Sequence, residues 1–163
     1  MLVVTRWIFS IALIGGLLGC AGPRKPKFQG PASQVYISDY DLTWRAAQKA
    51  MLDYPLKINN IDAGVIETDL IKGEELWKPP FKAKRRNPGL RYNIKLVATE
   101  GKRNGKAATR VRVYKKTTLE KDFFSGKKDI GSDGFEEQSI LYRIEREIEI
   151  EKALERAYRT NQI

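Results

Sequence analysis

Two segments of the chain have the apolar spacing of an amphipathic helix, and the first of them lies before residue 55. Its apolar stripe consists of Tyr40, Trp44, Ala47 and Met51, at intervals of four, three and four residues. Ser38 or Asp39 is in position to cap the first turn, and Pro55 ends the segment. The pattern therefore predicts a helix that runs to about Asp53, with Trp44 largely buried.

The second helical segment is longer and runs from Phe135 to about Thr160, a stretch that contains neither Gly nor Pro. Its apolar stripe is Leu141, Ile144, Ile148 and Ala157 or Tyr158, joined by Ile140 and Leu154. Glu and Arg side chains occupy the opposite face. A helix of this length extends for about 37 Å, so its stripe must be buried against another element, with Ile148 largely buried there.

Apolar and polar positions alternate between the two helical segments, which is typical of strands with one buried face. The predicted strands cover 56–61, 65–71, 91–99 and 107–119. Their inward residues are predicted to be Ile66, Thr68 and Leu70, then Tyr92, Ile94, Leu96 and Ala98, then Thr109, Val111 and Val113. The outward face of the last strand would present Arg110, Arg112, Tyr114 and Lys116.

The connections between these strands differ in length. Residues 62–64 are predicted to form a turn, and residues 100–106, which contain an Asn-Gly step, are predicted to form a hairpin connection. Two long loops are predicted at 72–89 and 121–134. Together the elements predict an α+β domain over residues 35–163. Its antiparallel sheet of four or five strands packs on the long C-terminal helix in a helix-grip arrangement, with the shorter helix beside it.

The first twenty residues have a different character from the rest of the chain. Trp7 to Leu18 is an apolar run of twelve residues, which has the length of a secretory signal rather than of a membrane-spanning helix. The run ends in Leu17-Leu18-Gly19-Cys20, which resembles the lipobox of bacterial lipoproteins. The resemblance implies a signal peptide over 1–19 and lipidation of Cys20, the only cysteine of the chain.

The segment that follows the cysteine, 20–34, is rich in Gly and Pro and is predicted to be an extended tether. Several acyl chains on Cys20 would hold the protein firmly on a bilayer. Because Ala21 rather than Asp follows the cysteine, we expect the outer membrane, with the folded domain facing the periplasm.

The composition excludes several kinds of catalytic site. The chain has 163 residues, no histidine and one cysteine, which excludes a zinc site, a His-dependent catalytic triad and an intrachain disulfide. Glu67 and Asp69 lie two apart on a predicted strand and are expected to share its outer face, either solvated or paired with Arg or Lys of the next strand. Glu145, Glu147, Glu149 and Glu151 are expected to form a solvated helix surface. We therefore predict a protein without catalytic residues or a cofactor.

The positive charge is concentrated in the middle of the chain. The net charge is +10, and residues 72–130 carry 18 of the 30 Lys and Arg side chains. The densest cluster directly follows two exposed aromatic positions. These residues, Trp77, Phe81, Lys82, Lys84, Arg85 and Arg86, form the candidate partner-binding segment. Because an exported protein does not meet nucleic acid in its normal setting, the expected partners are anionic lipid, glycan or an acidic protein surface.

Short motifs in the first half of the domain resemble a known family. A helix with Trp44 is followed by Asp53-Tyr54-Pro55-Leu56 and then by Gly64-Val65-Ile66-Glu67-Thr68-Asp69, while Arg91-Tyr92-Asn93-Ile94 is similar to the next strand. This series resembles the repeated domain of the BamC (NlpB) lipoproteins, which belong to the outer-membrane β-barrel assembly machinery. The similarity covers roughly residues 35–117. This chain differs from those lipoproteins in having one such domain instead of two and a much shorter tether.

The resemblance implies a non-catalytic, lipid-anchored accessory protein of an envelope complex, with subunits of that complex as its partners. Two other functions remain open at this stage. A helix-grip domain could carry a lipid or another apolar ligand between its sheet and helix, although Ile144, Ile148 and Leu154 are large enough to fill that space. The protein could also be a lipoprotein subunit of a secretion, pilus or flagellar machine.

Overall fold

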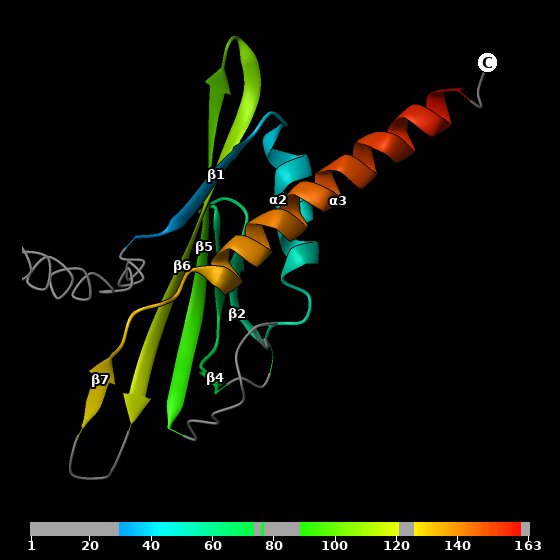
Figure 1. The fold of residues 1–163 in the computed structure, drawn as a ribbon. Helices are drawn as coiled ribbons and strands as arrows, with labels where there is room; N and C mark the ends of the chain where they lie inside the picture. The colour runs from blue at the N-terminus through cyan, green and yellow to red at the C-terminus, as the bar shows by residue number, and fades with distance from the viewer. Residues whose placement is uncertain (1–29, 74–75, 77–88, 121–125, 161–163) are drawn as a thin grey trace, which may run out of the picture.

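The computed structural model describes residues 30–73, 76, 89–120 and 126–160, and a long β-hairpin forms the centre of the fold (Figure 1). β5 (Leu90–Arg103) and β6 (Lys106–Glu120) pair antiparallel along their whole length. Asn104 and Gly105 connect them with φ angles of 53° and 75°. Positive φ at both central residues defines a two-residue hairpin turn, so the connection is shorter than the seven residues predicted at 100–106.

Shorter strands complete the sheet on both sides of this hairpin, in the order β1-β6-β5-β3-β2. The added strands are β1 (Ala32–Tyr36), β2 (Leu56–Asn60) and β3 (Val65–Thr68), with β4 (Ile71–Lys72) on β5 and β7 (Lys127–Asp129) on β6. All pairings are antiparallel. The α+β class and the antiparallel sheet on a long C-terminal helix are confirmed.

Two strands lie where loops or a tether were predicted. β1 begins at Ala32, so the folded part starts before the predicted end of the tether at residue 34. It pairs with β6 from Ala32 opposite Val113 to Tyr36 opposite Thr109. β7 occupies part of the predicted loop 121–134. Both segments are only five and three residues long, so their pairing with β6, rather than a sustained alternation of their own, makes them strands.

The predicted strand 65–71 is divided in the structure. β3 ends at Thr68 because its ladder with β2 reaches Pro55 at the next pair: Asp69 N donates to the carbonyl of Pro55 at 2.8 Å, but proline has no N–H to return a bond. The side chain of Asp69 then accepts a bond from Leu70 N at 2.7 Å. Leu70 is 52% exposed, so its predicted inward position was wrong, whereas Ile66 and Thr68 are buried as predicted.

Gly64 precedes β3 and has a structural requirement of its own. Its φ is +65°, its carbonyl accepts a bond from Ala98 N at 2.8 Å, and a Cβ there would collide with the carbonyl oxygen of Ala98. Only glycine fits this close approach of two backbones. The glycine of the motif that resembles the BamC family is therefore explained by local packing alone.

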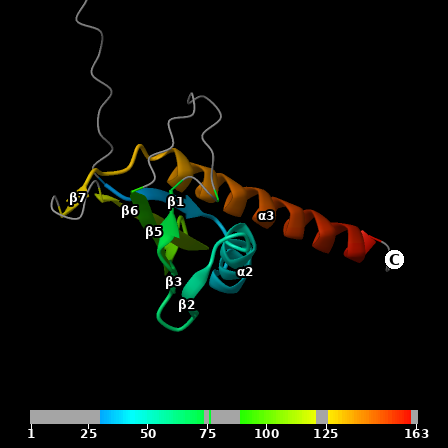
Figure 2. The same cartoon turned by 90° about the horizontal axis from the view of Figure 1, so that it is seen from below.

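The two helices lie on the same side of the sheet (Figures 1 and 2). α2 (Tyr40–Ala50) begins with Asp39 as its N-cap, whose carboxylate accepts a bond from Leu42 N at 2.8 Å. α3 (Phe135–Thr160) has the predicted bounds. Lys49 of α2 lies 2.9 Å from Glu151 of α3, so ion pairs link the two helices along their outer edge.

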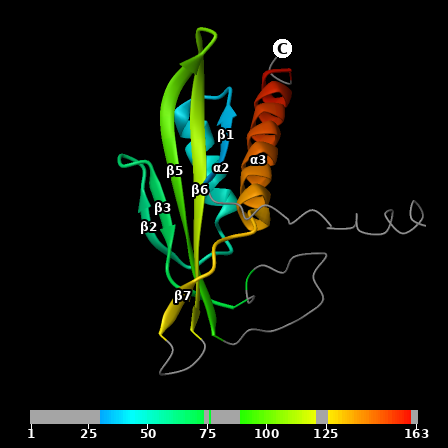
Figure 3. The same ribbon diagram turned by 60° about the vertical axis from the view of Figure 1, so that its left-hand side comes forward.

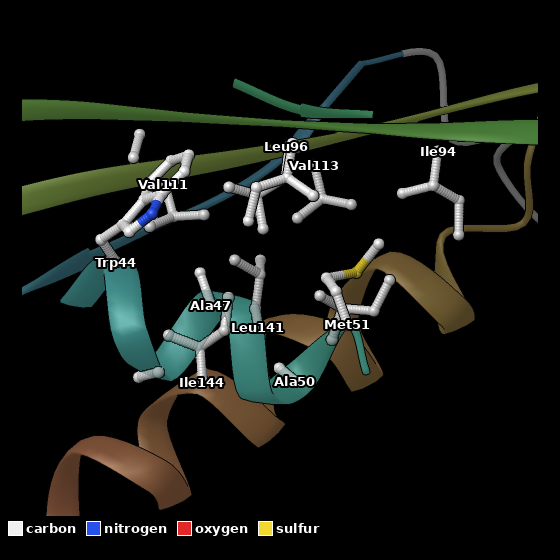
Figure 4. Packing of buried hydrophobic residues seen from close by; sticks show 14 of the residues in the cluster. Trp44, Ala47, Ala50, Met51, Ile94, Leu96, Val111, Val113, Leu141 and Ile144 are labelled. Carbon is white, nitrogen blue, oxygen red and sulfur yellow. The ribbon is translucent and has the colours of Figure 1, made fainter. Parts of the chain in front are cut away.

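The core fills the space between this side of the sheet and the helices (Figure 4). Trp44 and Ile148 are 2% and 5% exposed, which confirms the predicted burial of both. The other large members of the core are Met51, Ile66, Ile94, Leu96, Val111, Val113, Ile140, Leu141 and Ile144. The end of α3 differs from the prediction: Leu154 and Tyr158 are 53% and 70% exposed, and Ala157 is exposed too. They lie beyond Ile148, the last buried residue of the helix.

Candidate docking surface

The side of the sheet that faces away from the helices, whose strands can be followed in Figure 3, carries several cations along β5 and β6. Side chains alternate along a strand, so the residues that lie between the buried ones in β5 and β6 point to this side. They include Lys95 opposite Tyr114, Arg112 opposite Val97, and Arg110 opposite Thr99. We define the basic face as Arg91, Lys95, Arg110, Arg112, Tyr114 and Lys116. The outward orientation predicted for the four residues of β6 is confirmed.

Few acidic groups neutralise this face within the described part of the chain. Arg91 is the exception, because its guanidinium lies 3.4 Å from a carboxylate oxygen of Glu120. The side chains of Lys95, Arg110, Arg112 and Lys116 form no ion pair or hydrogen bond with another described residue. Adjacent unpaired cations repel one another, so an anionic partner that lies across them would relieve this repulsion.

A shallow hollow of about 410 Å³ lies at the centre of the basic face. Its lining combines Val97 and the ring of Tyr114 with Lys95, Lys116, Asn93 and Glu67. Tyr114 is 39% exposed. Asn93 donates a bond of 3.4 Å to Glu67, so the only carboxylate of the hollow already has a partner. The exposed aromatic ring is a residue type enriched at protein interfaces, and the two lysines beside it are complementary in charge to an acidic protein surface.

The candidate segment with Trp77, Phe81, Lys82, Lys84, Arg85 and Arg86 lies outside the described residues, as does Cys20. Two described residues flank that part of the chain. Gly73 N donates to the carbonyl of Leu90 at 2.6 Å, and the carbonyl of Gly89 accepts a bond from Glu120 N at 2.9 Å. Gly73 and Gly89 therefore both lie close to Arg91, at one end of the basic face.

A buried ion pair fixes β6 to the start of α3, and the sequence analysis missed it. Lys115 points inward between Tyr114 and Lys116, and its Nζ lies 2.6 Å from Oε2 of Glu136. Oε1 of the same carboxylate accepts bonds from the hydroxyls of Tyr54 and Tyr92, at 3.0 and 3.1 Å. The alternation of β6 was a usable signal, because it places Lys115 on the face of Val111 and Val113, where a lysine needs a buried anion.

Two further interactions support this buried network. The ammonium of Lys115 lies 4.4 Å from the centre of the Tyr92 ring, and Arg143 donates to the hydroxyl of Tyr54 at 3.2 Å. Burial raises the pKa of Tyr54, and the neighbouring charge of Glu136 raises it further. The phenol therefore stays protonated as a donor. This network positions the strand that carries most of the basic face, and we assign it no catalytic role.

Glu137 is a second buried carboxylate, next to Glu136, and is 1% exposed. Burial raises the pKa of Glu137, while hydrogen bonding from Ser132 and the charge of Lys115 work in the opposite direction. Its Oε2 atom has no hydrogen-bond partner in the part of the chain that the structure describes. An ionised carboxylate in this position is poorly compensated, so Glu137 couples the stability of the α3 start to pH.

The carboxylates singled out in the sequence do not converge. Glu67 faces the hollow, but Asp69 lies beyond the end of β3, so the expectation that they share a strand face was wrong. Glu145 accepts a bond from Gln34 of β1 at 3.1 Å. Glu147 and Glu151 pair with Lys49 of α2 rather than lying in solvent, and only Glu149, paired with Arg146, matches a solvated surface.

Among the described residues, no cluster of acidic side chains is arranged to hold a metal ion. In that same part of the chain, no helix is both long and apolar enough to cross a membrane. In sequence comparisons, no protein-family model matches the chain, and no curated protein matches it significantly.

Proposed function

We propose that the protein is a non-catalytic docking subunit of an envelope protein complex, anchored to the outer membrane by lipid at Cys20 and facing the periplasm. The complex that we favour is the machinery of outer-membrane β-barrel assembly, in a BamC-like role. The observation that carries the docking role is the row of cations around Tyr114, on the side of the sheet opposite the helices, that form no ion pair with a described residue. The lipobox-like sequence at Cys20 supports the anchor.

The basic face favours an acidic protein surface as the partner. It extends along the strands from Arg91 to Arg110, which is longer than one phosphate group or one carboxylate. An extended array of this kind accelerates association with a surface of opposite charge and fixes its orientation. Anionic lipid headgroups and glycans have the same charge, so they are the alternatives that an experiment must separate.

The filled core favours docking over the carriage of an apolar ligand. Met51, Leu96 and Ile144 are fully buried in the space where a helix-grip carrier would hold its cargo (Figure 4). A ligand of several carbon atoms would have to displace such side chains, and protein cores resist changes of even one methylene group. A role in secretion, pilus or flagellar assembly uses the same docking surface and differs only in the partner.

The test is capture of the tagged full-length lipoprotein from membranes dissolved in mild detergent. We expect barrel-assembly subunits to co-purify in stoichiometric amounts and to be released by salt. Secretion or motility subunits in their place would reject the assignment to barrel assembly. Recovery of the protein alone with bound lipid would reject the docking role and favour the carrier.

The anchor is tested separately with Cys20→Ala. We expect this variant to accumulate as an unprocessed precursor, because both processing and lipidation require the thiol. If it matures normally and still partitions with membranes, the lipoprotein assignment is wrong. The parent chain, labelled with a palmitate analogue, is the positive control.

A further inference from the structure

The exposed end of α3, residues 149–160, carries an apolar stripe that nothing in the described structure covers. Ile150, Leu154 and Tyr158 are 43%, 53% and 70% exposed and follow one another at intervals of four residues. Ala153 and Ala157 are exposed on the same stripe. This part of α3 continues past α2 in two perpendicular views (Figures 1 and 2). An amphipathic helix of this kind gains stability by burying its stripe against a partner.

We propose that this stripe pairs antiparallel with the same stripe of a second copy of this chain. The inference is independent of what the basic face binds. A shallow groove of about 710 Å³ runs along one flank of the stripe, lined by Ile150 and Ala153 together with Arg146, Glu149 and Arg156 among others. Such a groove accepts the ridge of a second helix.

Two copies of this flank bring opposite charges together when the second helix runs in the opposite direction. Glu149 and Arg156 lie seven residues apart, two helical turns, and so on the same side of the helix. A two-fold axis near Ala153 brings Glu149 of one copy beside the partner's Arg156, and the symmetry forms this contact twice. Antiparallel helix dipoles favour the same arrangement. A parallel pair would instead place like charges together.

The small side chain at the centre allows the two helices to approach closely. Ala153 lies nearest the proposed axis, and Ile150 and Leu154 flank it, so each isoleucine contacts the partner's Leu154. The stripe on each copy is about three turns long, which gives a modest interface. We therefore expect an association that depends on the high local concentration of lipoprotein in the membrane.

Disulfide crosslinking in isolated membranes tests this geometry, using full-length lipoprotein with one introduced cysteine. In the proposed pair, residue 153 of one copy lies almost level with residue 153 of the other along the helix axis. The two copies of residue 157 are offset by roughly 13 Å along that axis. A disulfide requires Cα atoms within about 7 Å. Ala153→Cys should therefore form a dimer under mild oxidation, and the matched variant Ala157→Cys should not. The parent chain controls for Cys20.

A charge-reversal series makes the test specific. Arg156→Glu in the Ala153→Cys background should reduce the crosslinked fraction several-fold, and adding Glu149→Arg should restore it. Absence of a dimer with Ala153→Cys would overturn the proposal. Equal crosslinking at 153 and 157 would also overturn it, because it indicates a parallel pair or random collision. A crosslink to a different protein would show that another helix occupies the stripe and would reject the second copy.

Discussion

The ammonium group of Lys115 lies 2.6 Å from a carboxylate oxygen of Glu136, on the side of the sheet that faces the helices. This pair connects the strand that carries Tyr114 and Lys116 to the first turn of α3. Glu136 is fully buried and also accepts two tyrosine hydroxyl bonds, so its charge is well compensated. The outward side chains of Tyr114 and Lys116, on either side of Lys115, thus depend on an inward cation for their position.

Removing one member of this pair should destabilise the fold more than removing both. Lys115→Met leaves the buried carboxylate of Glu136 without its counter-ion, and we expect a loss of about 3–5 kcal/mol in the free energy of unfolding. The double variant Lys115→Met with Glu136→Leu should recover a substantial part of that loss. Urea unfolding measures both values, and a double variant no more stable than Lys115→Met would contradict this account of the network.

The stability of the fold should depend on the protonation of Glu137. Burial raises the pKa of Glu137, so the folded state binds a proton more tightly than the unfolded state. The free energy of unfolding should therefore fall as the pH rises from the ordinary pKa of a glutamate, near 4.3, to the raised value in the fold. Glu137→Gln should abolish this part of the pH dependence and gain stability relative to the parent at neutral pH. Parallel stability curves for parent and variant from pH 4 to 7 would disprove the coupling.

Two apolar residues on α3 provide a matched test of which part of the helix is packed against the rest of the fold. Ile148 is 5% exposed and Leu154 is 53% exposed. Ile148→Ala should lower the free energy of unfolding by about 2–5 kcal/mol, because it leaves a cavity in the core. Leu154→Ala, measured at low protein concentration, should change it by about 0.5 kcal/mol or less. Similar losses for the two variants would show that the end of the helix is also packed.

Periodicity predicted the main helices and strands because each of them buries one face, and its buried side chains recur at the spacing of a helix or a strand. The stripe of α2, the bounds of α3 and the inward residues of β5 and β6 follow from spacing alone, since each buries one face. Leu154 and Tyr158 continue the spacing of α3, but the sheet and α2 do not reach them. Periodicity identifies an apolar stripe and not the element that covers it.

The candidate site was predictable only in part. Alternation placed Arg110, Arg112, Tyr114 and Lys116 on one face, but the contribution of Lys95 beside Tyr114 depends on the register between β5 and β6. The turn at Asn104 and Gly105 sets that register. Alternation places Lys115 on the inward face of β6, but its partner Glu136 comes from another element, so no local pattern could identify that partner. β1 was missed for the same reason, because its pairing with β6 is a long-range contact.

The central claim is that the basic face docks the partner subunit, and a matched pair of triple variants tests it most directly. One variant, Lys95→Gln with Arg112→Gln and Lys116→Gln, removes three charges around Tyr114. The other, Lys57→Gln with Lys102→Gln and Lys128→Gln, removes three exposed charges outside the basic face. The measurement is the amount of co-purifying subunit per lipoprotein, captured from membranes at moderate salt, with thermal unfolding confirming that both variants fold. We expect at least a tenfold loss for the basic-face variant and parental capture for the other. Equal capture by the two variants would contradict the assignment of this face as the docking surface.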